Sequence, residues 1–246
     1  MWAKRDDTFQ LGEVCGGKVR ACLYLASEAQ KDGARGLVTA CNIHSPQAGI
    51  VASVARHLNM WIKVYVNKYT HPTPELSFAL EAGATIIKSN STYDDGAERD
   101  AYKFVQGFRN SSRHWALIPF GMQCRTAVGL TSEQVGDIPA GVKRIVVPVG
   151  SGITLSGVLR GLRIEARDIP VLGVVVGRDP ENTLDLFAPR NWRGMCTLVW
   201  SGYPYSYRCK DVMLGDIELD EIYEAKALPY IKPGDMFWVV GKRNKA

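Results

Sequence analysis

Apolar residues follow two different spacings along this chain. Short runs of consecutive apolar residues are typical of buried parallel strands, and apolar residues recurring every three or four positions are typical of amphipathic helices. Buried strands are predicted over residues 36–40, 61–66, 85–88, 115–119, 143–149, 171–176 and 236–240, with a short edge strand at 2–4. The pattern therefore alternates strands with helical stretches for most of the chain.

Helices are predicted between most of these strands. The first spans residues 17–31 and ends at Asp32-Gly33, a typical helix stop. Another begins at Thr73-Pro74, with Thr73 as the N-cap, and ends near Gly83. Further helical spacing covers residues 50–58, 97–108 and 155–166, whereas residues 178–215 show no clear period. This order predicts an α/β fold with mainly parallel sheets, right-handed crossovers and helices on both faces.

Composition and charge narrow the class of protein. The chain has 246 residues, of which 46% are hydrophobic and 22% charged, as in soluble globular proteins. Its apolar runs stay below the roughly 18 residues that a membrane span needs, and residues 1–7 do not resemble a signal peptide. The six cysteines form no Cys-x-x-Cys pair, so we expect a cytoplasmic protein with reduced thiols and no metal site. The net charge of +5 permits an anionic partner without requiring one.

Two glycine-rich segments carry the candidate chemistry. In the first, Lys18 directly follows two glycines at the start of a predicted helix. In the second, Gly150 to Thr154 link a predicted strand to a predicted helix, where backbone N–H groups and the helix dipole favour an anion. A Schiff-base lysine and a phosphate site are what a pyridoxal-phosphate enzyme needs. The alternatives are a solvated surface lysine and an ordinary tight turn.

The residues around Lys18 resemble a known family. Trp2-Ala3-Lys4-Arg5-Asp6-Asp7, followed by Gly16-Gly17-Lys18-Val19-Arg20, is similar to the opening of the 1-aminocyclopropane-1-carboxylate deaminase and D-cysteine desulfhydrase branch of the tryptophan-synthase-β-like pyridoxal-phosphate enzymes (fold type II). That branch usually has Asn where this chain has Gly17. The resemblance implies pyridoxal 5′-phosphate as cofactor and two three-layer α/β/α domains. It divides the chain into a cofactor-anchoring large domain (1–33 and 126–246) and a small inserted domain (34–125).

The resemblance also implies roles for the two glycine-rich segments. Lys18 would form the Schiff base and later move a proton at the substrate, which burial and a helix N-terminus favour by lowering its pKa. The phosphate would be held by Gly150, Ser151, Gly152, Ile153 and Thr154. Family members often have glycine where this chain has Ile153, and an isoleucine cannot adopt a positive φ without strain.

The loop at 41–47, Cys-Asn-Ile-His-Ser-Pro-Gln, corresponds to the family loop that surrounds the substrate carboxylate. The resemblance implies substrate binding by His44, Ser45 and Gln47. Aligned on His44 and Gln47, the loop has Asn42 one position before the asparagine that faces the pyridoxal ring in the family. Either the loop shifts by one residue so that Asn42 serves, or that contact is missing. His44 could instead be a structural histidine.

Near the other end, Tyr223 and Glu224 resemble a Tyr-Glu pair whose carboxylate faces the pyridine nitrogen. A carboxylate there keeps the ring protonated and strengthens its pull on electrons. Tyr223 is a candidate catalytic residue. Tyr203, Tyr205 and Tyr207 lie in the segment that supplies a catalytic tyrosine in the family; the alignment leaves the choice among them open, and Tyr205 is taken as a candidate substrate contact. The alternatives are an exposed carboxylate at a helix start and a tyrosine-rich surface loop.

We therefore expect a pyridoxal-phosphate-dependent lyase or deaminase that forms an external aldimine with an amino-acid-like substrate and cleaves a bond at Cα. One alternative keeps this chemistry on an amino acid attached to a nucleotide or DNA base, as in bacteriophage DNA modification. Arg109, Arg113, His114 and residues 242–245 would then meet phosphates. A second alternative is a non-catalytic binding protein. Because the chain is short before the Lys-Arg-Asp-Asp segment and between 207 and 221, we expect either a site open on one side or an apolar surface for a partner subunit. We also expect a homodimer.

Overall fold

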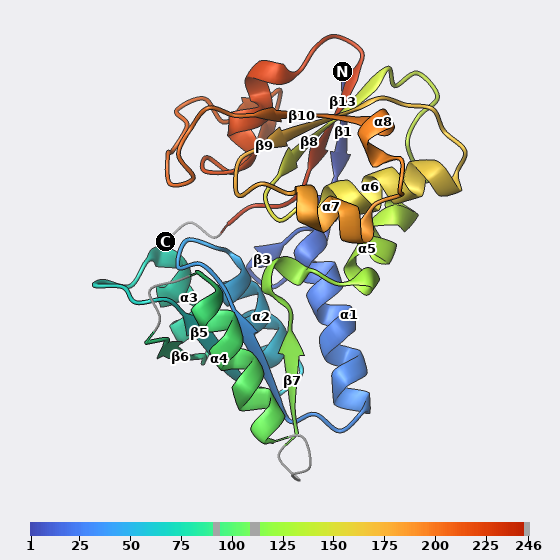
Figure 1. Cartoon of the computed structure of the whole chain (residues 1–246). Helices are drawn as coiled ribbons and strands as arrows, with labels where there is room; N and C mark the ends of the chain where they lie inside the picture. The colour runs from blue at the N-terminus through green and yellow to red at the C-terminus, as the bar shows by residue number, and fades with distance from the viewer. Residues whose placement is uncertain (91–93, 109–113, 244–246) are drawn as a thin grey trace. The chain divides into compact units, whose positions relative to one another are not determined.

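A parallel sheet forms the centre of each of the two units into which the chain divides. The computed structural model describes residues 1–90, 94–108 and 114–243. Unit 1 contains residues 1–8 and 123–242, and unit 2 contains residues 9–122 together with Arg243 (Figure 1). Every strand pair in the two main sheets is parallel, which confirms the predicted α/β class.

The sheet of unit 1 has five strands and apolar faces on both sides. Its order is β1 (Trp2–Arg5), β13 (Asp235–Val239), β8 (Arg144–Val149), β9 (Val171–Val175) and β10 (Cys196–Trp200). Neighbouring residues of β8 belong to different apolar clusters, Val146 to one and Val147 to the other. Both faces must therefore be covered, as in other α/β proteins. The predicted edge strand β1 is confirmed and pairs only with β13.

The remaining elements of unit 1 cover this sheet. They are α5 (Arg125–Ser132), α6 (Ile153–Ile164), α7 (Glu181–Phe187), α8 (Trp192–Met195), the 3-10 helices Asp6–Thr8, Glu133–Val135 and Glu224–Tyr230, and the hairpin of β11 (Met213–Leu214) and β12 (Ile217–Glu218). Helices α5 and α6 approach closely because Gly157 and Gly161 lie one turn apart on α6. A Cβ at Gly157 would stand 2.4 Å from the Cβ of Thr131.

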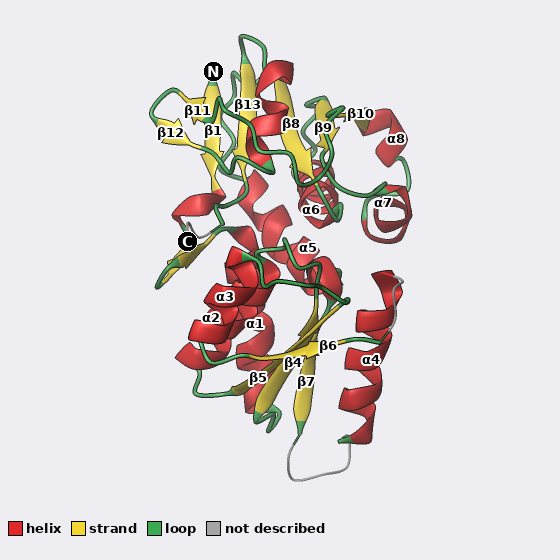
Figure 2. Cartoon of the chain, turned by 90° about the vertical axis from the view of Figure 1, so that its left-hand side faces the viewer, coloured by secondary structure: helices red, strands yellow, loops and turns green. Residues whose placement is uncertain are grey.

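Unit 2 is a three-layer unit. Its sheet has the order β6 (Thr85–Lys88), β5 (Trp61–Val66), β4 (Gly36–Ala40) and β7 (Trp115–Ile118). The helices α1 (Gly17–Lys31), α2 (Gln47–His57) and α3 (Pro74–Glu81) lie on one side of this sheet, and α4 (Asp94–Gly107) lies on the other (Figure 2). The unit also contains the hairpin of β2 (Gln10–Leu11) and β3 (Val14–Cys15) and the 3-10 helix Phe120–Met122. The Thr73 hydroxyl accepts a hydrogen bond from the Leu76 amide, which confirms the predicted N-cap of α3.

Several elements were not predicted. Strand β10 and the short helices α7 and α8 fall in residues 178–215, where the sequence has no period. Strand β10 is an edge strand with mixed burial, so its apolar pattern is weak. The division of the chain at 33/34 and 125/126 stays a prediction, and contacts group α1 with unit 2.

No helix within the described residues combines the length and apolar character needed to cross a membrane. The six cysteines all lie within those residues and form no disulfide.

Candidate active site

Lys18 is the second residue of α1, and the turn before it requires glycine. Gly16 caps the helix with φ +110°, a conformation that side-chain-bearing residues rarely adopt, and its amide donates to the Phe9 carbonyl at 2.9 Å. The Lys18 side chain is partly buried. Burial lowers the pKa of its amine to about 8, the nearby Cys41 opposes this shift and the Arg243 charge adds to it. A larger neutral fraction at physiological pH makes this amine a better nucleophile than an ordinary lysine.

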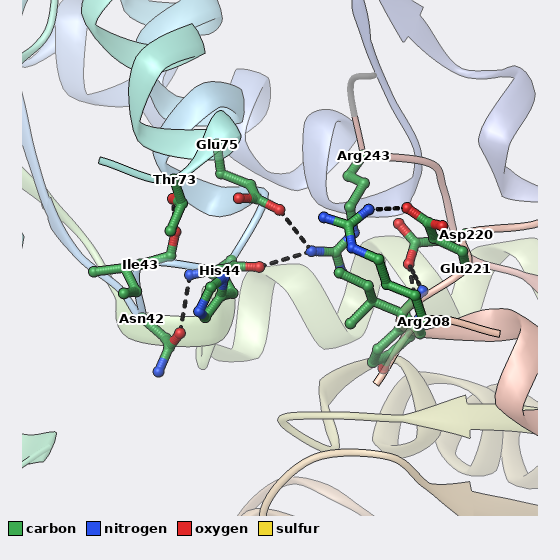
Figure 3. Close-up of polar contacts among 12 residues, drawn as sticks. Asn42, Ile43, His44, Thr73, Glu75, Arg208, Asp220, Glu221 and Arg243 are labelled. Carbon is green, nitrogen blue, oxygen red and sulfur yellow. Dashed lines mark hydrogen bonds and ion pairs between the residues drawn. The ribbon is translucent and has the colours of Figure 1, made fainter. Parts of the chain in front are cut away.

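The loop between β4 and α2 has a fixed backbone. The Asn42 side-chain oxygen accepts from the His44 amide at 2.9 Å, and the Asn42 carbonyl accepts from the Ser45 amide at 2.9 Å. Two side chains from other segments donate to the next carbonyls: the Thr73 hydroxyl to Ile43, and Arg243 Nη1 to His44 at 2.8 Å (Figure 3). The loop is thus held both from within and from outside.

Gln47, predicted to contact the substrate, is almost completely buried. Its side-chain nitrogen donates to the Thr39 hydroxyl at 2.8 Å and to the Pro119 carbonyl at 2.9 Å. It therefore joins the ends of β4 and β7. Its side-chain oxygen is buried and has no partner in the described part of the chain. Substrate binding by Gln47 stays a prediction.

The turn at 150–154 begins α6 in the way that an anion site requires. Gly152 caps the helix with φ +87°, and Ile153 is the first helical residue. The positive φ therefore falls on Gly152, so an isoleucine at position 153 introduces no backbone strain. Gly150 is also constrained, because a Cβ there would stand 2.9 Å from Cε2 of Tyr223. The first amides of a helix have no intrahelical acceptor and can turn to a bound anion.

Tyr223 lies against this turn, and Glu224, the next residue, is buried among backbone amides. The Tyr223 hydroxyl donates to the Pro148 carbonyl at 3.2 Å, and burial raises the pKa of this hydroxyl well above its ordinary value. Glu224 is fully buried and accepts from the amides of Val240, Gly241 and Asp220. Burial raises the pKa of Glu224 to about 8, although the amide hydrogen bonds oppose this shift. An exposed carboxylate at a helix start, the alternative from the sequence, is therefore wrong.

The three tyrosines of 203–207 have different environments. Tyr203 and Tyr207 are exposed and stack on each other with ring centroids 4.6 Å apart. Tyr205 is partly buried, and its charge is among the causes that raise the pKa of Tyr223. The buried Lys226 fixes this segment by donating to the carbonyls of Pro204 and Tyr205, both at 2.8 Å. Sequence reasoning gave Lys226 no role, although it stands two residues after Glu224.

The predicted site residues fall into two groups. Lys18, Asn42, His44, Ser45 and Gln47 belong to unit 2, and residues 150–154, Tyr205, Tyr223 and Glu224 belong to unit 1. Each group contains part of what pyridoxal phosphate needs: an amine with a depressed pKa in one, a glycine turn at a helix start and a buried carboxyl in the other. These features and the parallel α/β units define the class of pyridoxal-phosphate enzymes.

Comparison with known proteins gives the family. The chain belongs to the family described as pyridoxal-phosphate dependent enzyme, whose model matches residues 1–192. It is 26% identical over 239 residues to 1-aminocyclopropane-1-carboxylate deaminase from Burkholderia cenocepacia (strain HI2424), covering 91% of this chain and 68% of the relative. It is 29% identical over 188 residues to a putative deaminase of the same name from Pyrococcus horikoshii, covering 72% of this chain and 56% of the relative.

A solved structure of a homologue of this deaminase shares the fold. It aligns with a TM-score of 0.82 and 22% identity and covers 97% of this chain and 83% of that one. The predictions of a fold type II pyridoxal-phosphate enzyme and of its cofactor are therefore confirmed. The roles of individual site residues stay predictions.

Proposed function

We propose that this protein is a pyridoxal-phosphate-dependent lyase or deaminase that cleaves a bond at Cα of an amino-acid-like substrate. The observation that carries the proposal is the partly buried Lys18, at the start of α1, with a pKa of about 8. When bound, the cofactor supplies an aldehyde that joins amines and a ring that withdraws electrons from Cα. The names of the deaminase relatives support this reaction class.

Lys18 would hold the cofactor covalently and then move the proton at Cα. An amine titrating near neutral pH suits both tasks, because it is partly neutral when it attacks and basic enough to accept a proton. The amides of residues 150–154 and the hydroxyls of Ser151 and Thr154 would bind the phosphate at the start of α6.

Glu224 would share a proton with the ring nitrogen. With a pKa of about 8, the buried carboxyl carries that proton at neutral pH. The pair of carboxyl and ring nitrogen is neutral overall wherever the proton sits, so no isolated charge is buried. Tyr223 keeps its hydroxyl proton because burial raises its pKa, and it would therefore act as a donor and not as a base.

The loop at 42–46 would bind the carboxylate of the substrate. Ser45 offers a hydroxyl and His44 an imidazole, and both lie on a backbone that is already fixed by hydrogen bonds. A preformed loop loses little conformational entropy when a ligand binds. Tyr205 would add a further substrate contact.

The decisive test is covalent capture of the cofactor. The protein is reconstituted with pyridoxal phosphate, reduced with borohydride, digested and analysed by mass spectrometry. We expect the adduct on the peptide that contains Lys18, and no adduct there in Lys18→Ala. Lys31→Ala, which removes an exposed lysine at the other end of α1, is the matched control and should be captured like the wild type. An unmodified Lys18 peptide in the wild type would contradict the proposal.

The substrate is found by a spectral screen of the cofactor-loaded protein against D- and L-amino acids and against amino acids attached to nucleotides. A response to the attached amino acids alone would favour the DNA-modification alternative. Arg109 and Arg113, assigned to phosphate contacts under that alternative, lie outside the described residues, and Arg243 is buried in an ion pair. Cofactor binding without any substrate response would favour the non-catalytic alternative. The expected homodimer is tested by sedimentation.

A further inference from the structure

Arg243 forms a buried ion pair with Glu75, a residue that is distant from it in sequence. Its Nη1 lies 2.9 Å from Glu75 Oε1, and only 8% of the Arg243 side chain and 5% of the Glu75 side chain are exposed. The same nitrogen donates to the His44 carbonyl at 2.8 Å (Figure 3). Burying a guanidinium and a carboxylate costs desolvation energy, which good geometry and additional hydrogen bonds must offset. The His44 carbonyl is one such additional acceptor.

The partners of Arg243 tie it to the loop at 42–46. Glu75 is the second residue of α3, and Thr73, the N-cap of that helix, donates to the Ile43 carbonyl. Two consecutive carbonyls of the loop are thus held by side chains that converge at the start of α3. One of the two donors comes from 199 residues away in sequence.

The charge of Arg243 also acts on Lys18. Arg243 lowers the pKa of the Lys18 amine in addition to the larger effect of burial, and Cys41 acts in the opposite direction. Arg243 therefore affects both the loop backbone and the amine at the start of α1.

We propose that Arg243 is a positioning residue that holds the 42–46 loop against α3 and keeps a fixed positive charge near Lys18. The proposal rests on the proposed function only in that it takes this loop as the substrate carboxylate site and Lys18 as the cofactor lysine. Arg243 itself acts through the loop and is not a catalytic residue.

Hydrogen exchange of the apoprotein tests the proposal without any cofactor. In Arg243→Gln we expect the amides of His44 and Ser45 to exchange roughly tenfold faster or more, because local opening becomes easier. Arg243→Lys keeps the charge but loses the planar fork and should give an intermediate rate. The Glu75→Gln/Arg243→Gln double variant should exchange no faster than the more affected single variant, because the two residues act as a unit.

Arg144→Gln is the matched control. It breaks another partly buried arginine–carboxylate pair, with Asp235 in unit 1, and should lower the melting temperature without changing exchange in the loop. The proposal would be overturned if the hydrogen-exchange rates of the loop amides in Arg243→Gln stayed within twofold of the wild-type rates. Equal acceleration by Arg144→Gln would also overturn it, since the effect would then be general destabilisation.

A second readout is the pH dependence of covalent cofactor capture. Without the Arg243 charge the pKa of Lys18 rises, so the midpoint of capture should move to higher pH in Arg243→Gln. Cys41, which also influences the pKa of Lys18, is the same in both proteins. A midpoint that stays or moves to lower pH contradicts the charge role. Failure of the proposed function gives a different result: cofactor capture would then be the same in Lys18→Ala as in the wild type. The hydrogen-exchange experiment would still decide the role of Arg243 in the loop.

Discussion

Two strand-to-helix connections, one in each unit, are held in their conformations by different means. The turn at 150–154 after β8 depends on glycine: Gly152 has a positive φ and Gly150 leaves room for the Tyr223 ring. The loop at 41–47 after β4 depends on side chains from Thr73 and Arg243. Connections at the carboxyl ends of parallel strands are where α/β proteins bind ligands. The first therefore depends mainly on its own glycines, and the second depends also on side chains from elsewhere in the chain.

The largest effect is expected from Gly150→Ala, which would disturb the turn at 150–154. The new methyl group would meet the Tyr223 ring at 2.9 Å, and the ring cannot retreat easily because its hydroxyl is bonded to Pro148. Relieving an overpacked contact of this kind typically costs about 1–3 kcal/mol, so we expect cofactor affinity to fall by roughly ten- to a hundredfold. The measurement is a titration of the apoprotein with pyridoxal phosphate. Gly194→Ala, where a Cβ meets nothing within 4 Å, should leave the affinity unchanged.

The second largest effect is expected on the pH dependence of stability, through the buried carboxyl of Glu224. Glu224, next to the Tyr223 that contacts the turn, has a native pKa of about 8 against an ordinary value of 4.5. Between these values the native protein keeps a proton that the unfolded chain releases, so stability decreases as pH rises, by at most about 1.4 kcal/mol per pH unit. Glu224→Gln should flatten this decrease in the apoprotein.

Thermal unfolding of wild type and Glu224→Gln from pH 5 to about pH 8 measures this difference. The exposed Glu165→Gln is the control and should keep the slope of the wild type. If Glu224→Gln keeps the slope of the wild type, the carboxyl takes up no extra proton in the native state and the assignment is wrong.

The smallest effect is expected from Thr73→Val, which weakens the side-chain support of the loop at one point. The variant loses the cap of α3 and the donor to the Ile43 carbonyl. Loss of an N-cap costs about 1 kcal/mol, which denaturant unfolding measures. Thr73→Ser retains the hydroxyl and should restore most of this stability. A loss of stability in Thr73→Ser with none in Thr73→Val would mean that the methyl group, and not the hydroxyl, supports the loop.

The same contrast explains what the sequence could and could not predict. The turn at 150–154 and the Thr73-Pro74 helix start were predictable because their signals are local: glycine where φ is positive, and a hydroxyl residue with proline at a helix start. The burial of Glu224 needs the backbone amides of 240 and 241, which no local pattern indicates. The pair of Glu75 with Arg243 joins residues 168 positions apart, so neither residue carries a local signal for it.

The pairing of β1 with β13 has a consequence for biosynthesis. Strand β1 is synthesised long before residues 236–239, which form its partner strand in the described sheet of unit 1. Most of unit 2 is complete after residue 122, and domains generally fold as units during synthesis. Strand β1 must therefore wait for β13 while the sheet of the other unit assembles, and Arg243 reaches its place on unit 2 only after that sheet has been synthesised.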